Sequence, residues 1–229
     1  MTMKLYELCG ADETNLFSPH CWKTRLSLAH KGLDFESAPV PFTGVATIEG
    51  GENRKVPVLR DGDTVVEESM EIALYLDKTY PDAPSLFKGE GAKAMTRLII
   101  TWSQSQIHPI IARMSIMDIF ARLAPADQQH FRTTREKLFG MTLEDFSTKM
   151  AATPDDLKKA ILPLEMLLRD QPYIGGDTPL FADYVVFGPL QWLRTMQGEQ
   201  GLPQDGTVAD WFGRLLDMYD GMGRAQKAA

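Results

Sequence analysis

Residues 18–22 read Ser-Pro-His-Cys-Trp, and this stretch decides how the first part of the chain folds. Serine is a favoured N-cap and proline is favoured at the first helical position, so the stretch predicts a helix from residue 18 to about residue 30. Trp22 and Leu26 then share one face of the helix, as the core-facing side of an amphipathic helix requires. The start of this helix presents free N–H groups and a positive dipole end beside Ser18.

Strand and helix patterns alternate on both sides of this stretch and give the order βαβ, loop, ββα. An Asp-Gly turn signal at residues 61–62 separates the last two strands. This order predicts a mixed four-stranded sheet. The expected strands are residues 4–8, 35–40, 56–59 and 64–66, the loop is 41–53, and the second helix starts at Ser69 and ends at 80–81.

The pattern changes after residue 90, where only helical periodicities remain. A linker with Pro81, Pro84 and Gly89 precedes them. We therefore expect an α/β domain at 1–80, a linker at 81–90 and an all-helical domain at 91–229. The expected helical segments are residues 91–122, 126–150, 154–169, 182–197 and 208–220, with a kink at Pro109.

Composition narrows the possible functions. The formal net charge is −7, which opposes long-range attraction to nucleic acid or to anionic membranes. An anionic ligand must therefore be held by helix N-termini and single basic residues. Only Cys9 and Cys21 are present, which fits a reducing, cytoplasmic location, and no apolar stretch is long enough to span a bilayer. No spacing typical of a metal site occurs.

Ser18 and Cys21 are the first candidates for chemistry. A cysteine at position 18 would create a Cys-x-x-Cys redox motif, but serine stands there. A serine hydroxyl can donate a hydrogen bond to a bound thiolate and so lower the pKa of that thiol. The plain alternatives are that Ser18 is only a helix cap and that Cys21 is a small buried apolar residue.

Two further segments could hold an extended peptide with an amino-acid end. A cis bond at Val56-Pro57 would leave the backbone of Val56 free to pair with a peptide, and Lys55 supplies local positive charge. Ser69, expected to cap the second helix, offers an anion site, and Glu68 beside it could pair with an ammonium group. The alternatives are a trans proline at a strand edge, a solvated lysine and an ordinary capped helix.

Two residues of the helical part have mainly structural interpretations. Asp183 lies in the first turn of an expected helix and is the acidic half of a capping box. Leu180 stands where that motif has Ser or Thr, so Thr178 is an alternative cap. His108 precedes Pro109, and an ordinary histidine role is favoured over catalysis.

The order of these motifs resembles the cytosolic glutathione transferase superfamily over nearly the whole chain. The motifs are Ser-Pro at a helix start, Lys-Val-Pro, Glu-Ser opening a helix, a proline-bearing linker and Phe-Ala-Asp-Tyr at 181–184. Several stretches are also similar to bacterial β-etherase-type enzymes, which cleave aryl ethers with glutathione. These are Ser18-Pro19 with Trp22, residues 42–44, 75–82, 175–184 and 220–224. Unlike many of those enzymes, this chain stops five residues past Arg224.

The resemblance implies a thioredoxin-like fold for the first domain and assigns roles to the candidate residues. Ser18 would activate the sulfur of glutathione, the co-substrate, and Lys55 would hold its glycine end. Val56, beside a cis Pro57, would pair with its cysteinyl backbone. Glu68 and Ser69 would bind its γ-glutamyl end.

The resemblance also implies a cytoplasmic homodimer with a detoxification role and a small hydrophobic electrophile as second substrate, held by residues 91–229. Asp183 would match the helix-capping aspartate of the family. Two other functions stay open: a thiol-disulfide oxidoreductase using Cys21, and a non-catalytic glutathione- or ligand-binding protein. Neither nucleic acid nor a membrane is an expected partner.

Overall fold

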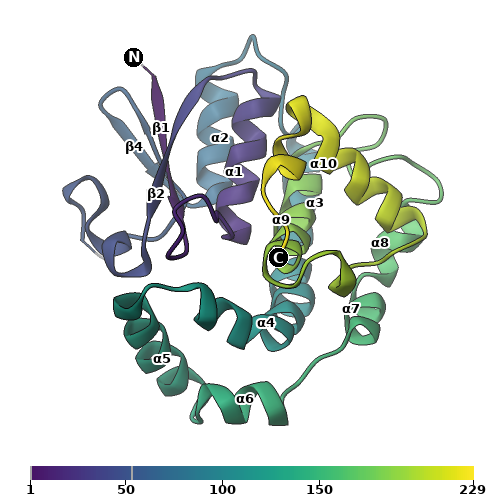
Figure 1. The fold of residues 1–229 in the computed structure, drawn as a ribbon. Helices are drawn as coiled ribbons and strands as arrows, with labels where there is room; N and C mark the ends of the chain where they lie inside the picture. The colour runs from purple at the N-terminus through teal and green to yellow at the C-terminus, as the bar shows by residue number, and fades with distance from the viewer. Residues whose placement is uncertain (1, 53) are drawn as a thin grey trace.

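The computed structural model describes residues 2–52 and 54–229; Met1 and Asn53, the last residue of the expected 41–53 loop, lie outside the described residues. A mixed four-stranded sheet occupies one side of the molecule, and helices form the other side (Figure 1). The strand order is β2-β1-β3-β4, with β1 parallel to β2 and antiparallel to β3. The strands are β1 Met3–Leu8, β2 Phe35–Val40, β3 Val58–Asp61 and β4 Thr64–Glu67.

The first two helices, α1 (Pro19–His30) and α2 (Ser69–Thr79), pack against each other beside this sheet (Figure 1). Their apolar faces and the sheet share one core, in which Leu26, Ile72 and Leu59 are fully buried. Burial of apolar surface is the main force that holds this layer together. The expected βαβ-ββα fold with a mixed sheet is confirmed.

Three local expectations in this region need correction. Strand β3 begins at Val58 instead of residue 56, because Pro57 has no N–H to donate to a ladder. The segment 41–53, expected as a loop, contains a 3-10 segment at Phe42–Gly50. Ser69 is the first residue of α2 and not its cap; Glu68 occupies the N-cap position with φ 67°, and no side chain bonds to the free N–H groups there.

The rest of the chain is helical, as expected, but four of the expected segments, 91–122, 126–150, 154–169 and 208–220, are interrupted. A π-helical turn at Ser103–Ile107 divides the expected segment 91–122 into two helices, so the kink lies just before Pro109. Gly140 adopts a left-handed conformation with φ 68° and ends a helix inside 126–150. The helices are α3 Glu90–Trp102, α4 His108–Arg122, α5 Pro125–Phe139, α6 Leu143–Lys149, α7 Pro154–Ala160, α8 Leu162–Leu167, α9 Phe181–Gln197 and α10 Thr207–Ala225.

Helix α9 is the central element and joins the two layers. It packs closely against α1 and α4. Gly188 permits the contact with α1, since a Cβ atom at that position would lie 2.2 Å from the Pro19 carbonyl oxygen. This contact fixes the start of α1, where Ser18 lies, against the helical layer.

Asp183 secures the start of α9 from a fully buried position. Its carboxylate accepts hydrogen bonds from the backbone N–H groups of Ile174, Gly175 and Leu180 at 2.7 to 2.9 Å, and from Trp211 Nε1 at 2.9 Å. Burial raises the pKa of this carboxyl, while the four donors act to lower it. Thr178 does not cap the helix, because Leu180 occupies the N-cap position; the hydroxyl of Thr178 accepts a bond from Lys88 Nζ.

Within the described residues, no helix is long and apolar enough to cross a membrane.

Candidate active site

Ser18 lies at the N-cap of α1, as the sequence predicts, and is 4% exposed. Its Oγ atom accepts a hydrogen bond from the backbone N–H of Cys21 at 3.3 Å. A hydroxyl that accepts one bond still has its own hydrogen to donate. Ser18 therefore offers a hydroxyl donor beside the positive end of a helix dipole, an arrangement suited to a bound thiolate.

Cys21 lies one turn further along α1 and has a different environment. It is 2% exposed, and burial raises the pKa of its thiol to about 12. The reactive form of cysteine is the thiolate, which is almost absent at neutral pH with such a pKa. The structure thus favours the interpretation of Cys21 as a small buried apolar residue.

A buried lysine and two histidines extend from the start of α1 into the helical layer. Lys23 is 1% exposed, and burial lowers the pKa of its ammonium group to about 8. Its Nζ lies 3.2 Å from His20 Nδ1. An ammonium group only donates, so Nδ1 accepts and the ring hydrogen of His20 is on Nε2.

The ring of His20 stacks on that of His108, with centroids 5.3 Å apart and planes 19° apart. His108 Nδ1 donates to the Ser103 carbonyl oxygen at 2.9 Å, because a carbonyl only accepts. Burial lowers the pKa of His108 to about 4, and the pKa of His20 is also lowered, by burial and by Lys23. Both rings are therefore neutral at pH 7.

A cavity of about 420 Å³ opens at Ser18 between the two layers. Its volume lies in the range of sites that hold small organic ligands. The wall is largely aromatic and aliphatic and comes from both the α/β part and the helical part of the chain. The lining residues are Leu8, Phe17, Ser18, Pro19, His20, Phe42, Val56, His108, Pro109, Ala112, Ile116, Ile119, Phe131, Arg135, Phe139 and Trp192.

Val56 lines this cavity together with Ser18, and the Val56–Pro57 peptide bond is cis. Pro57 is buried, whereas Lys55 is exposed and does not line the cavity. The neighbouring Arg54 forms an ion pair with Glu67, so it is not a free cation.

Glu68 and Ser69 lie at the start of α2, outside the wall of the cavity. Glu68 is exposed and has a positive φ of 67°. Its negative charge favours the ammonium form of Lys23 and so partly offsets the lowering of the Lys23 pKa by burial. Ser69 is 7% exposed and is the first residue of α2, whose free N–H groups have no side-chain cap. This helix start is suited to an anion.

Several residues of the wall, and Lys23 behind His20, were not singled out by the sequence as functional. His20 stands inside the Ser-Pro-His-Cys-Trp stretch, which is the one signal that would have found it. Lys23, Arg135 and Trp192 carry no local signal, and their proximity to the cavity depends on how α1, α5 and α9 pack. His108, given an ordinary role from the sequence, lines the cavity.

The chain thus has a thioredoxin-like sheet, a helical layer and a cavity at a serine-capped helix. This combination is suited to a two-layer protein that binds a thiol. Comparison with known families identifies the family of the chain. The glutathione S-transferase C-terminal domain matches residues 94–219, and the N-terminal domain matches residues 17–79. The chain belongs to the glutathione S-transferase family.

Individual relatives agree with this placement. A glutathione S-transferase of Hyoscyamus muticus is 24% identical over 72% of this chain and 74% of its own. Glutathione S-transferase 1 of Dianthus caryophyllus is 32% identical over 71% of this chain and 67% of its own. A solved glutathione S-transferase of Ceriporiopsis subvermispora, in complex with glutathione, has the same fold, with a TM-score of 0.83 at 24% identity over 96% of this chain and 98% of that one.

The protein is thus a glutathione transferase, and glutathione is its co-substrate.

Proposed function

We propose that Ser18 donates a hydrogen bond to the sulfur of bound glutathione and holds it as a thiolate. The observation that supports this is the position of Ser18, at the N-terminus of α1 and at the wall of the cavity, with an Oγ that accepts a bond from Cys21 N–H and keeps its own hydrogen to donate. The proton of the thiol passes to solvent. The α1 dipole and the Ser18 hydroxyl both stabilise the negative charge that remains.

The thiolate then attacks an electrophile in the cavity. A carbon–sulfur bond forms, and the leaving group departs with the electron pair of the bond that breaks. The apolar wall favours a hydrophobic, aromatic electrophile, and an aryl ether, whose leaving group is an aryloxide, is one candidate. Holding both substrates in one cavity replaces a bimolecular encounter by an oriented contact.

Glutathione is proposed to extend from Ser18 along the edge that holds Val56. The backbone of Val56 beside the cis Pro57 pairs with the cysteinyl unit, and Lys55 binds the glycine carboxylate. The N-terminus of α2 at Ser69 binds the γ-glutamyl carboxylate, and Glu68 pairs with the ammonium group. These local groups offset the repulsion between an anionic ligand and a protein of net charge −7.

We propose the same division of the chain as the sequence does, with a glutathione-binding domain at 1–80, a linker at 81–90 and a helical domain at 91–229. The electrophile cavity draws on both domains. The protein is proposed to act as a cytoplasmic homodimer in detoxification. Exposed apolar side chains on α3, Met95 and Leu98, support a face for a second copy.

The test removes the hydroxyl of Ser18. A hydrogen bond to a charged group contributes about 1.5–3 kcal/mol, so Ser18→Ala is expected to raise the pKa of bound glutathione by about 1 to 2 units. Turnover at pH 7 falls at least about 10-fold, while the Kd of glutathione changes little. The matched control is Ser27→Ala on the same helix, whose hydroxyl bonds to the Lys23 carbonyl oxygen at 2.7 Å. An unchanged pKa and unchanged turnover in Ser18→Ala would remove Ser18 from the reaction.

A thiol-disulfide oxidoreductase that uses Cys21 would give a different result when Cys21→Ser is tested beside the Ser18 and Ser27 variants. Cys21→Ser then abolishes reductase activity, and a mixed disulfide with glutathione appears by mass spectrometry. Because the pKa of Cys21 is raised to about 12, we expect neither the loss of a reductase activity nor the mixed disulfide.

A further inference from the structure

The wall of the electrophile cavity carries one fully charged side chain among the described residues, that of Arg135. The two histidines of the wall are neutral at pH 7, and the other lining residues are aromatic, aliphatic or hydroxyl-bearing. A single guanidinium group in such a wall is costly unless a partner offsets the loss of its water.

Arg135 has no carboxylate or hydrogen-bond partner in the part of the chain that the structure describes, and the one charge-stabilising contact that it makes there is with an aromatic ring. Its side chain is half-buried, and its guanidinium lies over the ring of Phe131, 5.2 Å from the centroid. Neither an ion pair nor a hydrogen bond of this side chain occurs among residues 2–52 and 54–229. Burial lowers the pKa of the guanidinium, and no carboxylate counteracts that effect.

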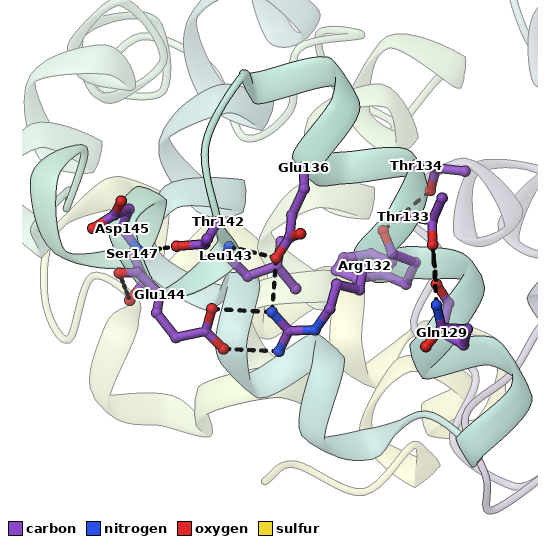
Figure 2. Close-up of polar contacts among 11 residues, drawn as sticks. Gln129, Arg132, Thr133, Thr134, Glu136, Thr142, Leu143, Glu144, Asp145 and Ser147 are labelled. Atoms are coloured by element: carbon purple, nitrogen blue, oxygen red, sulfur yellow. Dashed lines mark hydrogen bonds and ion pairs between the residues drawn. The ribbon is translucent and has the colours of Figure 1, made fainter.

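The neighbouring Arg132 shows the usual arrangement for comparison. Figure 2 shows its guanidinium bound to two carboxylates, Glu144 and Glu136. The nitrogen–oxygen distances are 2.7 to 3.0 Å, and the Glu144 contact uses both oxygens. Both arginines are on α5, three residues apart, and only Arg135 lines the cavity.

From this contrast we infer that Arg135 is a specificity-determining residue for an acidic second substrate: a hydrophobic, aromatic electrophile that carries a carboxylate. This inference rests on the proposed function, since it assigns the electrophile to the cavity at Ser18. A planar guanidinium binds a carboxylate through two parallel hydrogen bonds, which fixes orientation as well as affinity. The net charge of −7 gives such a substrate no long-range attraction, so a local cation is the means of holding it.

The binding of the carboxylate also orients the electrophile. With its anionic end on Arg135 and its ring among Phe17, Phe42 and Phe131, the substrate has one defined pose in the cavity that Ser18 shares. Because His20 and His108 are neutral, Arg135 is the wall residue that discriminates between anionic and neutral electrophiles.

The experiment compares two electrophiles of nearly equal shape, 4-fluoro-3-nitrobenzoate and 4-fluoro-3-nitrobenzamide. In both, the carbon–sulfur bond forms at the ring carbon, and fluoride leaves with the electrons of the carbon–fluorine bond. Dividing each kcat/KM by the uncatalysed rate with glutathione removes the difference in intrinsic reactivity. The variants are Arg135→Gln, Arg135→Lys and, as the matched control, Arg132→Gln.

We expect the wild type to prefer the acid over the amide by about 10-fold or more, chiefly through KM, because a charge-assisted bidentate pair forms in an apolar cavity. Arg135→Gln loses this preference while retaining turnover of the amide. Arg135→Lys keeps part of it, and Arg132→Gln keeps all of it. The preference also weakens at high salt, whereas turnover of the amide does not.

A wild type without the preference, or an Arg135→Gln variant that retains it, overturns the inference. If neither compound is turned over, the Kd values of 4-nitrobenzoate and 4-nitrobenzamide, measured by calorimetry with glutathione present, decide the same question. Failure of the proposed function is distinguishable, because it removes the effect of Ser18→Ala on the glutathione pKa and leaves the acid preference untouched.

Discussion

Asp183 offers the largest stability effect that this structure predicts. Its buried carboxylate accepts from four donors, three backbone N–H groups and Trp211 Nε1; the bonds from Leu180 and Trp211 are buried and those from Ile174 and Gly175 are partly buried. Leaving a buried donor without a partner costs about 1–3 kcal/mol. Asp183→Ala therefore lowers the free energy of unfolding by at least about 4 kcal/mol, a large share of the 5–15 kcal/mol typical of a folded protein.

Asp183→Asn is the more informative change because it keeps the shape of the side chain. Its single oxygen can accept from two of the four donors, while its NH2 group faces the other two. Removing the buried charge offsets part of this loss, so we expect a cost of about 2–3 kcal/mol.

Urea unfolding at fixed protein concentration measures these costs, with Asp210→Asn as the control. Asp210 is exposed in the first turn of α10 and makes no side-chain hydrogen bond within the described residues, so its loss costs about 0.5 kcal/mol. If Asp183→Asn behaves like Asp210→Asn, the four-donor account of this helix start is wrong.

Three further predictions concern contacts around the site. Lys23→Met removes an ammonium group whose pKa falls from 10.5 to about 8 on folding, so the unfolded wild type binds more protons than the folded one between these values. In urea unfolding, the wild type therefore gains about 2.5 kcal/mol of stability relative to the variant as pH rises from 7 to 10. Gly188→Ala places a methyl group against the Pro19 carbonyl oxygen and lowers the free energy of unfolding by about 1–3 kcal/mol. The same clash displaces the start of α1, where Ser18 lies, so kcat also falls. Asp127 accepts bonds from the N–H groups of Phe42 and Thr43, at the start of the 3-10 segment, at 2.9 to 3.0 Å. Asp127→Asn loses one of these bonds, so KM for the electrophile rises about 3- to 10-fold while the Kd of glutathione stays constant.

Each of these predictions has a result that contradicts it. Parallel stability curves for Lys23→Met and the wild type from pH 7 to 10 mean that Lys23 is not desolvated. Gly213→Ala is the control for Gly188→Ala, since nothing lies within 4 Å of a Cβ atom there, and equal effects of the two would deny the close contact of α9 with α1. An unchanged KM in Asp127→Asn would mean that the position of Phe42 does not affect electrophile binding.

The sequence predicted the elements whose signals are local. Ser18-Pro19 marks the start of α1 because capping chemistry acts within one turn, and the Asp-Gly turn marks the β3–β4 hairpin. Gly140 was overlooked as a helix end, although its left-handed conformation is the usual reason for a glycine there. The sequence predicts Ser69 as the N-cap of α2, whereas it is the first helical residue, because serine is compatible with either position.

The candidate site was less predictable, because it depends on which charges are left without partners after folding. Arg132 and Arg135 are three residues apart on one helix, and no pattern in the sequence separates the paired one from the unpaired one. Lys23 looks like a solvated lysine until the packing of α1 buries it. Such properties follow from tertiary packing and not from local sequence.

The central claim is that this chain binds glutathione as a thiolate at Ser18. Titration of the wild type with glutathione by calorimetry, with thiolate absorbance followed across pH in the same samples, tests it most directly. The account predicts saturable binding and a thiol pKa well below that of free glutathione, with the shift reduced in Ser18→Ala and kept in Ser27→Ala. Binding without a lowered pKa, or no binding at all, contradicts it.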